Sequence, residues 1–204
     1  MTQPTIPSRV PAGATPEGDG IVVGTGLVRV DASIDFLCPF CKQFELSSAK
    51  TLAALVSSGQ ASIAYHPMNF LDEASTTRYS TRAAAASGCA ADQGHFTEFA
   101  HALFEQQPPE GGPGRSDEQL AAIGREVGLT SPAFTGCLAD QPYLDWPSYV
   151  TERAVAAQVT GTPTVMVAGQ DVPAEPDAIR AAVAEATPQA PGPAGGGQTR
   201  NKAE

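Results

Sequence analysis

Two cysteines separated by two residues, Cys38-Pro39-Phe40-Cys41, lie where one local sequence pattern changes into another. The segment before them, 27–36, is rich in β-branched and apolar side chains and predicts a strand that feeds a turn. From Cys41 to Leu55, apolar or small residues recur every three or four positions, which predicts a helix with one buried face. A second strand is predicted over 61–66, so this part of the chain reads strand, helix, strand.

The position of the cysteines at the start of the helix has chemical consequences. Pro39 suits the first helical position, where a missing N–H costs nothing, and Cys38 then becomes the N-cap. Its sulfur faces the free N–H groups of the first turn and the positive end of the helix dipole, which lowers the pKa of the thiol. Cys41 lies one turn deeper, within reach of Cys38 and shielded from solvent. The motif predicts an attacking thiol at Cys38 and a resolving thiol at Cys41.

A Cys-x-x-Cys pair is also a common half of a structural zinc site, which requires a second pair of ligands. The two other cysteines, Cys89 and Cys137, belong to no second motif of this kind, and no metal site is predicted. Three residues spaced by three, His95, Glu98 and His101, are interpreted as a solvated polar face of a helix. His66, at the end of the second strand, is interpreted as a structural histidine.

The remaining pattern describes one domain with two tails. Helical patterns occupy about 72–158, a third strand is predicted at 164–169, and a last helix at 175–186. This order favours an α/β fold with a helical insertion between the second and third core strands. Residues 1–20 and 187–204 are rich in Pro, Gly and polar residues and are predicted to be flexible tails around a domain spanning 21–186.

Charge and hydropathy exclude several functions. With 22 acidic and 12 basic residues, the net charge of −10 disfavours nucleic acid and anionic lipid surfaces as partners. No stretch approaches the roughly 18 apolar residues of a membrane-spanning helix. Residues 1–20 contain neither a charged n-region nor an apolar h-region, so no secretion signal is recognised. We expect either a cytoplasmic protein or one whose export signal or anchor is missing from this chain.

Over 21–186 the sequence resembles the DsbA-type thiol-disulfide oxidoreductases of the thioredoxin superfamily. The resemblance rests on the segment Asp35–Cys41, on the helical block, and on Gly161-Thr162-Pro163-Thr164 just before the third strand. It implies a thioredoxin-like fold in which Cys38 and Cys41 form the redox pair, with Pro39 and Phe40 completing the motif. It also implies that Pro163 is cis and lies opposite Cys38, where the backbone of Thr162 pairs with an extended client segment.

The same resemblance implies the partners and the compartment. Such enzymes need no cofactor, act on reduced client proteins, and are reoxidised by a membrane protein of the DsbB or VKOR type. An extracytoplasmic location is implied, with the cytoplasm as the alternative.

One position departs from the family. Ala32 stands six residues before Cys38, where many members have a buried glutamate that handles the proton of the resolving thiol. Asp35 is the first candidate for this acid. The alternative is an ordinary solvated aspartate at a strand end.

Cys89 and Cys137 are left for each other if Cys38 and Cys41 form a pair. Some actinobacterial relatives have an extra disulfide in the helical block, and such a bond would argue for an oxidising compartment. The alternative is two buried free thiols, which are common in protein cores.

The leading hypothesis is a protein disulfide oxidase whose reduction potential lies above that of thioredoxin, about −270 mV. Two alternatives remain: a reductase or isomerase of the same fold, and a non-catalytic interaction module with structural cysteines.

Overall fold

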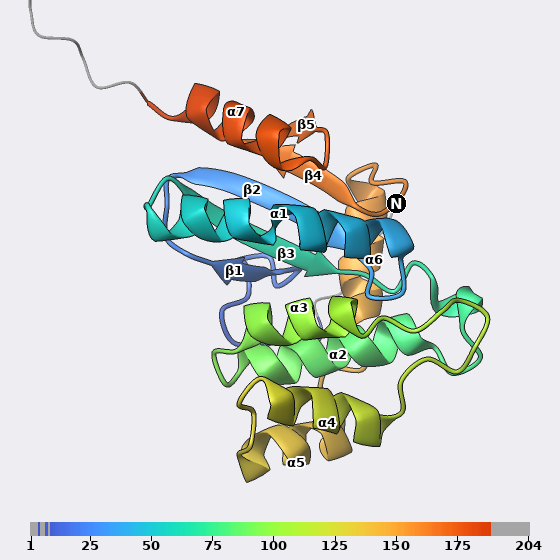
Figure 1. Cartoon of the computed structure of the whole chain (residues 1–204). Helices are drawn as coiled ribbons and strands as arrows, with labels where there is room; N and C mark the ends of the chain where they lie inside the picture. Colours follow the sequence, from blue (N-terminus) through green and yellow to red (C-terminus); the bar gives the residue numbers. More distant parts are fainter. Residues whose placement is uncertain (1–3, 5–6, 8, 189–204) are drawn as a thin grey trace, which may run out of the picture.

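The structure is a computed structural model that describes residues 4, 7 and 9–188. Its centre is one five-stranded sheet with strand order β1-β3-β2-β4-β5 (Figure 1). The central pair β2–β3 is parallel, and the other neighbours are antiparallel. The strands are β1 (Ile21–Val23), β2 (Val28–Ile34), β3 (Ala61–Pro67), β4 (Thr164–Val167) and β5 (Gln170–Val172).

The parallel pair requires a crossover connection, which α1 (Pro39–Ser57) provides. The C-terminal helix α7 (Pro176–Ala186) contacts both α1 and β4. Between β3 and β4 the chain forms the helical insertion. Its elements are the 3-10 turn η1 (Asp72–Ala74) and the helices α2 (Tyr79–Ala91), α3 (Phe96–Glu105), α4 (Asp117–Glu126), α5 (Pro132–Asp140) and α6 (Trp146–Ala156).

In Figure 1, α2 to α5 lie together below the sheet, and α6 leads the chain back to it. The insertion is joined to the sheet layer through the contact between α1 and α3 and through the contact between α6 and β3. The Ala-rich helix α2 packs against α3, α4, α5 and α6, and nearly all of its residues are buried. Its small side chains are explained by this position, since they let several helices approach closely.

The predicted α/β fold with an insertion between the second and third predicted strands, here β3 and β4, is confirmed. The sequence analysis missed β1 and β5, because both strands have three residues, too few for a periodic pattern. Helix α5 lies within the predicted helical block and begins at Pro132. Helix α2 begins at Tyr79, directly after Arg78, which adopts a left-handed backbone conformation (φ 54°).

The prediction of a flexible tail over 1–20 is wrong for the part that the structure describes. The carbonyl oxygen of Gly18 accepts a hydrogen bond from the buried indole of Trp146 (2.8 Å), and that of Glu17 accepts one from Tyr149 (2.7 Å). These contacts use backbone groups, which a Pro- and Gly-rich composition does not reveal. Residues 1–3, 5–6 and 8 lie outside the described residues, as does nearly all of the predicted tail 187–204.

Cys89 and Cys137 form a disulfide that links α2 to α5, with a Cα–Cα distance of 5.8 Å. The alternative of two free thiols is therefore wrong. The bond also removes both cysteines from any zinc site shared with Cys38 and Cys41.

Removing this disulfide is expected to destabilise the protein without affecting its chemistry. The two cysteines are 48 residues apart in sequence, and cross-links of this kind typically contribute about 2–4 kcal/mol. We expect urea unfolding of the Cys89→Ser, Cys137→Ser double variant to show a free energy of unfolding lower by about that amount. Disulfide exchange by the folded variant, measured in parallel, should equal that of the wild type. Unchanged stability would contradict the prediction.

Candidate active site

The two free cysteines lie at the N-terminus of α1. Cys38 is the N-cap and Pro39 the first helical residue, as predicted. Cys38 is 4% exposed and Cys41 is completely buried, whereas Phe40 between them is 68% exposed. Cys38 therefore keeps a small exposed surface next to the exposed ring of Phe40, whereas Cys41 has none.

The segment Gly161–Thr164 lies directly beside Cys38. The Thr162–Pro163 peptide bond is cis, as predicted, and the Cys38 Sγ is 3.2 Å from the carbonyl oxygen of Thr162. The sheet explains this proximity, since Ser33 near the end of β2 pairs with Thr164 at the start of antiparallel β4. The residues that follow β2 and those that precede β4 consequently meet at one edge of the sheet.

The two thiols have opposite electrostatic environments. A hydrogen bond from Cys41 lowers the pKa of Cys38 to about 5, against the effect of burial, and the side chain of Thr162 and the N–H groups of Cys41 and Phe40 assist. Burial raises the pKa of Cys41, and the neighbouring charge of Cys38 adds to this effect. At neutral pH the reduced site therefore holds a thiolate at Cys38 and a thiol at Cys41.

This difference predicts selective alkylation of the reduced protein. The rate at which iodoacetamide modifies Cys38 should increase with pH, because the thiolate is the nucleophile. The rate should reach half of its maximum near pH 5 and be nearly constant around pH 7. Mass spectrometry after brief treatment at pH 6 should show one added group, on Cys38. The Cys38→Ser variant serves as the blank. A half-maximal rate near pH 8.5, the value for an ordinary cysteine, would contradict the prediction.

Asp35 is fully buried, so the interpretation as a solvated aspartate is wrong. Its carboxylate accepts hydrogen bonds from the N–H groups of Leu37 (2.8 Å) and Leu71 (2.8 Å) and from the hydroxyl of Ser80 (2.7 Å). Its own N–H donates to the Sγ of Cys41 at 3.4 Å. Burial raises the pKa of Asp35 to about 6, although these hydrogen bonds oppose the rise. The carboxyl group thus joins the redox turn, Asp35–Cys38, to the insertion.

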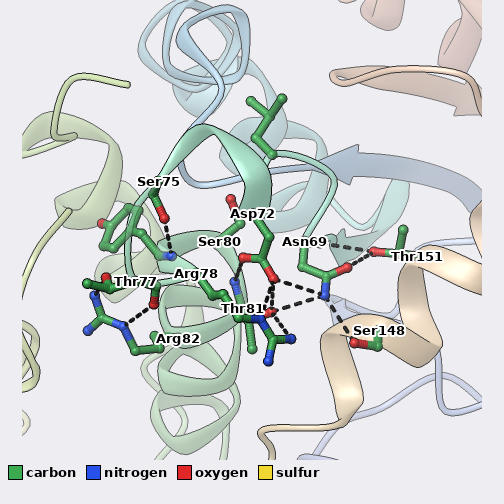
Figure 2. Close-up of polar contacts among 12 residues, drawn as sticks. Asn69, Asp72, Ser75, Thr77, Arg78, Ser80, Thr81, Arg82, Ser148 and Thr151 are labelled. Carbon is green, nitrogen blue, oxygen red and sulfur yellow. Dashed lines mark hydrogen bonds and ion pairs between the residues drawn. The ribbon is translucent and has the colours of Figure 1, made fainter. Parts of the chain in front are cut away.

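A second set of polar contacts joins the loop after β3 to the helices of the insertion (Figure 2). Asp72 accepts hydrogen bonds from the backbone and side chain of Thr81, and Asn69 contacts Thr81, Ser148 and Thr151. The loop between β3 and α2 is thereby fastened to α2 and to α6. This loop carries Leu71, so the network fixes one of the donors to Asp35.

An open groove of about 690 Å³ runs along the site. Phe40 and Phe44 of α1 line it together with Thr162 and Pro163 of the cis-proline segment. The groove thus lies next to the redox motif, between α1 and the cis-proline segment.

Two histidines that the sequence analysis did not assign to the active site have contacts outside it. His66 contacts the carbonyl oxygen of Asp19 (2.7 Å) and the carboxylate of Asp31 (3.0 Å), a structural role as interpreted. Glu98 is exposed as expected, but His101 contacts Glu45 of α1 at 3.1 Å. Among the described residues, no three His, Cys, Asp or Glu side chains gather as metal ligands.

Gln107 contacts the redox turn and was missed by the sequence analysis. It follows α3, and its side-chain amide reaches the backbone of Phe36 and Cys38, 71 and 69 residues earlier in the chain. No local pattern marks this glutamine among its neighbours.

The fold and the site define a class of protein: a thioredoxin-like domain with a helical insertion and a Cys-x-x-Cys pair opposite a cis-proline. A sequence profile described as Thioredoxin matches residues 20–185, so the chain belongs to the thioredoxin family.

Within this family the chain is similar to two solved structures from Mycobacterium tuberculosis. It is 31% identical to oxidised DsbA, with 85% of this chain and 95% of that one covered and a TM-score of 0.72. It is 33% identical to the reduced disulfide oxidoreductase DsbG, with 84% and 88% covered and a TM-score of 0.73. The protein is a DsbA-like thiol-disulfide oxidoreductase.

The chain is also similar to two other actinobacterial proteins. MdbA, a thiol-disulfide oxidoreductase from Actinomyces oris, has the same fold with 22% identity and a TM-score of 0.70, with 89% of this chain and 91% of that one covered. The serine/threonine-protein kinase PknE of Mycobacterium tuberculosis is 36% identical over 129 residues. The matched part is 59% of this chain but only 23% of the kinase.

Proposed function

We propose that this oxidoreductase works in the oxidising direction and donates the Cys38–Cys41 disulfide to reduced client proteins. The observation that carries the proposal is the position of Cys38 at the N-cap of α1, where a hydrogen bond from Cys41 lowers the pKa of its thiol to about 5. Only the reduced protein contains this thiolate, so its stabilisation favours reduction of the enzyme and hence oxidation of the client.

The reaction proceeds by two thiol-disulfide exchanges. A client thiolate attacks the Sγ of Cys38, the bond to Cys41 breaks, and Cys41 leaves as a thiolate that takes up a proton. A second client thiolate then attacks the client sulfur of the mixed disulfide and releases Cys38 as a thiolate. The client loses two electrons and the enzyme gains them. Asp35 is the proposed acid for the Cys41 proton, because its pKa is about 6 and its backbone contacts the Cys41 sulfur.

The groove beside Phe40 is the proposed client-binding surface, with the backbone of Thr162 pairing with an extended client segment. Because Pro163 follows Thr162 and has no backbone N–H, no donor at position 163 competes with the client segment for hydrogen bonds. Regeneration requires a partner that removes the two electrons, which we propose is a membrane protein of the DsbB or VKOR type. The Cys89–Cys137 disulfide supports an extracytoplasmic location, because such bonds persist in oxidising compartments. Among the described residues, no helix has the length and apolar character that crossing a membrane requires.

The reduction potential tests the direction of the reaction. At pH 7, a thiol with a pKa of about 5 instead of the value of about 7 in thioredoxin stabilises the reduced form by about 2 kcal/mol, or roughly 50 mV. Equilibration with glutathione buffers should therefore give a reduction potential of about −220 mV for the Cys38–Cys41 pair. The enzyme should also speed the oxidative refolding of a reduced protein. A potential at or below about −270 mV would identify a reductase instead.

A further inference from the structure

The side chain of Gln107 forms a bridge between the helical insertion and the redox turn. Its Nε2 donates to the carbonyl oxygen of Phe36 at 3.0 Å and to that of Cys38 at 2.9 Å. Because both partners can only accept hydrogen bonds, their chemistry requires the NH₂ side of the amide at this position. One amide group therefore holds two carbonyl groups that flank Leu37.

These two carbonyl groups define the geometry of the turn between β2 and α1. The Cys38 carbonyl oxygen also accepts the first helical hydrogen bond, from the N–H of Lys42 (3.1 Å), and the N–H of Cys38 donates to the backbone carbonyl oxygen of Asp35 (3.0 Å). The amide of Gln107, which belongs to the segment after α3, adds two hydrogen bonds to this turn from another part of the chain. It therefore determines where the N-cap residue lies relative to the first N–H groups of α1.

The segment that carries Gln107 is itself anchored. Lys42 of α1 donates to the carbonyl oxygen of Glu105 (3.1 Å), and the guanidinium of Arg115 donates to that of Gln106 (2.7 Å). The backbone of the two residues before Gln107 is thus hydrogen-bonded to α1 by Lys42 and to the following loop by Arg115. A side chain that projects from a fixed backbone is suited to positioning the group that it contacts.

We propose that Gln107 is a positioning residue for the redox reaction: by holding the carbonyl groups of Phe36 and Cys38, it keeps the Cys38 sulfur in the environment that stabilises its thiolate. This inference rests on the proposed role of Cys38. Through Gln107, the helical insertion takes part in determining the redox equilibrium of a motif that lies outside it.

The effect falls on one redox state. In the reduced protein, the Cys38 thiolate is stabilised first by the hydrogen bond from the Cys41 thiol, and then by Thr162 and the N–H groups of Cys41 and Phe40. In the disulfide the sulfur is uncharged and needs these contacts much less. A loosened turn therefore costs free energy mainly in the reduced state and makes the enzyme a weaker oxidant.

Two substitutions separate hydrogen bonding from packing. Gln107→Met retains a side chain of similar length but has no N–H donor. Gln107→Glu retains the shape and places a carboxylate against two carbonyl oxygens, close to the thiolate. The matched control is Gln106→Met, because the neighbouring Gln106 directs its amide to Glu126, away from the redox turn.

The test measures the equilibrium constant with glutathione and the pH profile of Cys38 alkylation. For Gln107→Met we expect the constant to change about fivefold toward the disulfide form, the equivalent of one hydrogen bond, and the alkylation midpoint to move to higher pH. The change should be larger for Gln107→Glu and absent for Gln106→Met. A purely structural role would lower the melting temperature and leave both redox readouts unchanged.

The outcomes distinguish this inference from the proposed function. If the wild type has an oxidising potential and Gln107→Met has the same potential and pH profile, the positioning role is wrong and the proposed function stands. If the wild type itself has a potential at or below that of thioredoxin, the oxidase proposal fails. A shift in Gln107→Met would then still support the positioning role.

Discussion

The Cys41→Ser protein is expected to accumulate covalent adducts with its clients, whereas the Cys38→Ser protein is expected to form none. In the reduced Cys41→Ser variant, the Cys38 thiolate can still attack a client disulfide. The mixed disulfide that forms then persists, because the buried thiol that would release it is gone. In Cys38→Ser the nucleophile is absent, and Cys41 is completely buried with a raised pKa. Disulfide exchange should therefore fall to the uncatalysed rate.

The adducts are measured by incubating each variant with an oxidised test protein, followed by non-reducing electrophoresis and mass spectrometry. The Cys38→Ser, Cys41→Ser double variant is the control for nonspecific capture. Serine is similar in size to cysteine, so circular dichroism should show the same fold in all three proteins. If Cys38→Ser traps the test protein and Cys41→Ser does not, the two roles are reversed.

Asp35→Ala is expected to lower the free energy of unfolding by about 3 kcal/mol or more near pH 5. The substitution leaves the N–H groups of Leu37 and Leu71 and the hydroxyl of Ser80 without their acceptor in a buried site. Each such loss costs about 1–3 kcal/mol. Urea unfolding measures the effect, and Asp171→Ala, which changes an exposed aspartate of β5, is the control. Equal stability of Asp35→Ala and the wild type would contradict the structural role of this carboxylate.

The stability contributed by Asp35 should also decrease as the pH rises. Its folded pKa of about 6 lies above the ordinary value of 3.8, so the folded protein retains a proton that the unfolded chain releases between these values. The free energy of unfolding should therefore fall by about 2 kcal/mol between pH 4 and pH 7 from this group alone. The oxidised protein is used, because Cys38 and Cys41 do not titrate in it; burial, the main cause of the raised pKa of Asp35, acts in that state too, without the smaller contribution of the Cys38 charge. Asp35→Asn should lack this decrease, and an unchanged slope in that variant would refute the assignment.

The chemistry of the motif could be predicted from the sequence because it is local. Pro39 allows a helix to begin where it does, and the N-cap position of Cys38 follows from the next residue alone. The environment that lowers its pKa is partly the first turn of its own helix. The alternation of strand and helix patterns likewise predicted β2, α1 and β3. For Cys89 and Cys137 the sequence allowed a disulfide or two free thiols, and the structure shows the disulfide.

The tertiary structure decided everything that depends on distant partners. Asp35 could be identified as a candidate acid, but its burial follows from Leu71 and Ser80, which the fold brings to it from the insertion. The contact of Gln107 with Cys38, and the packing of the segment before Gly20 on Trp146, join residues 69 and 128 positions apart. Local propensity depends only on neighbouring residues. A contact between polar groups that are distant in sequence depends on the path of the whole chain, so the residue types alone do not predict it.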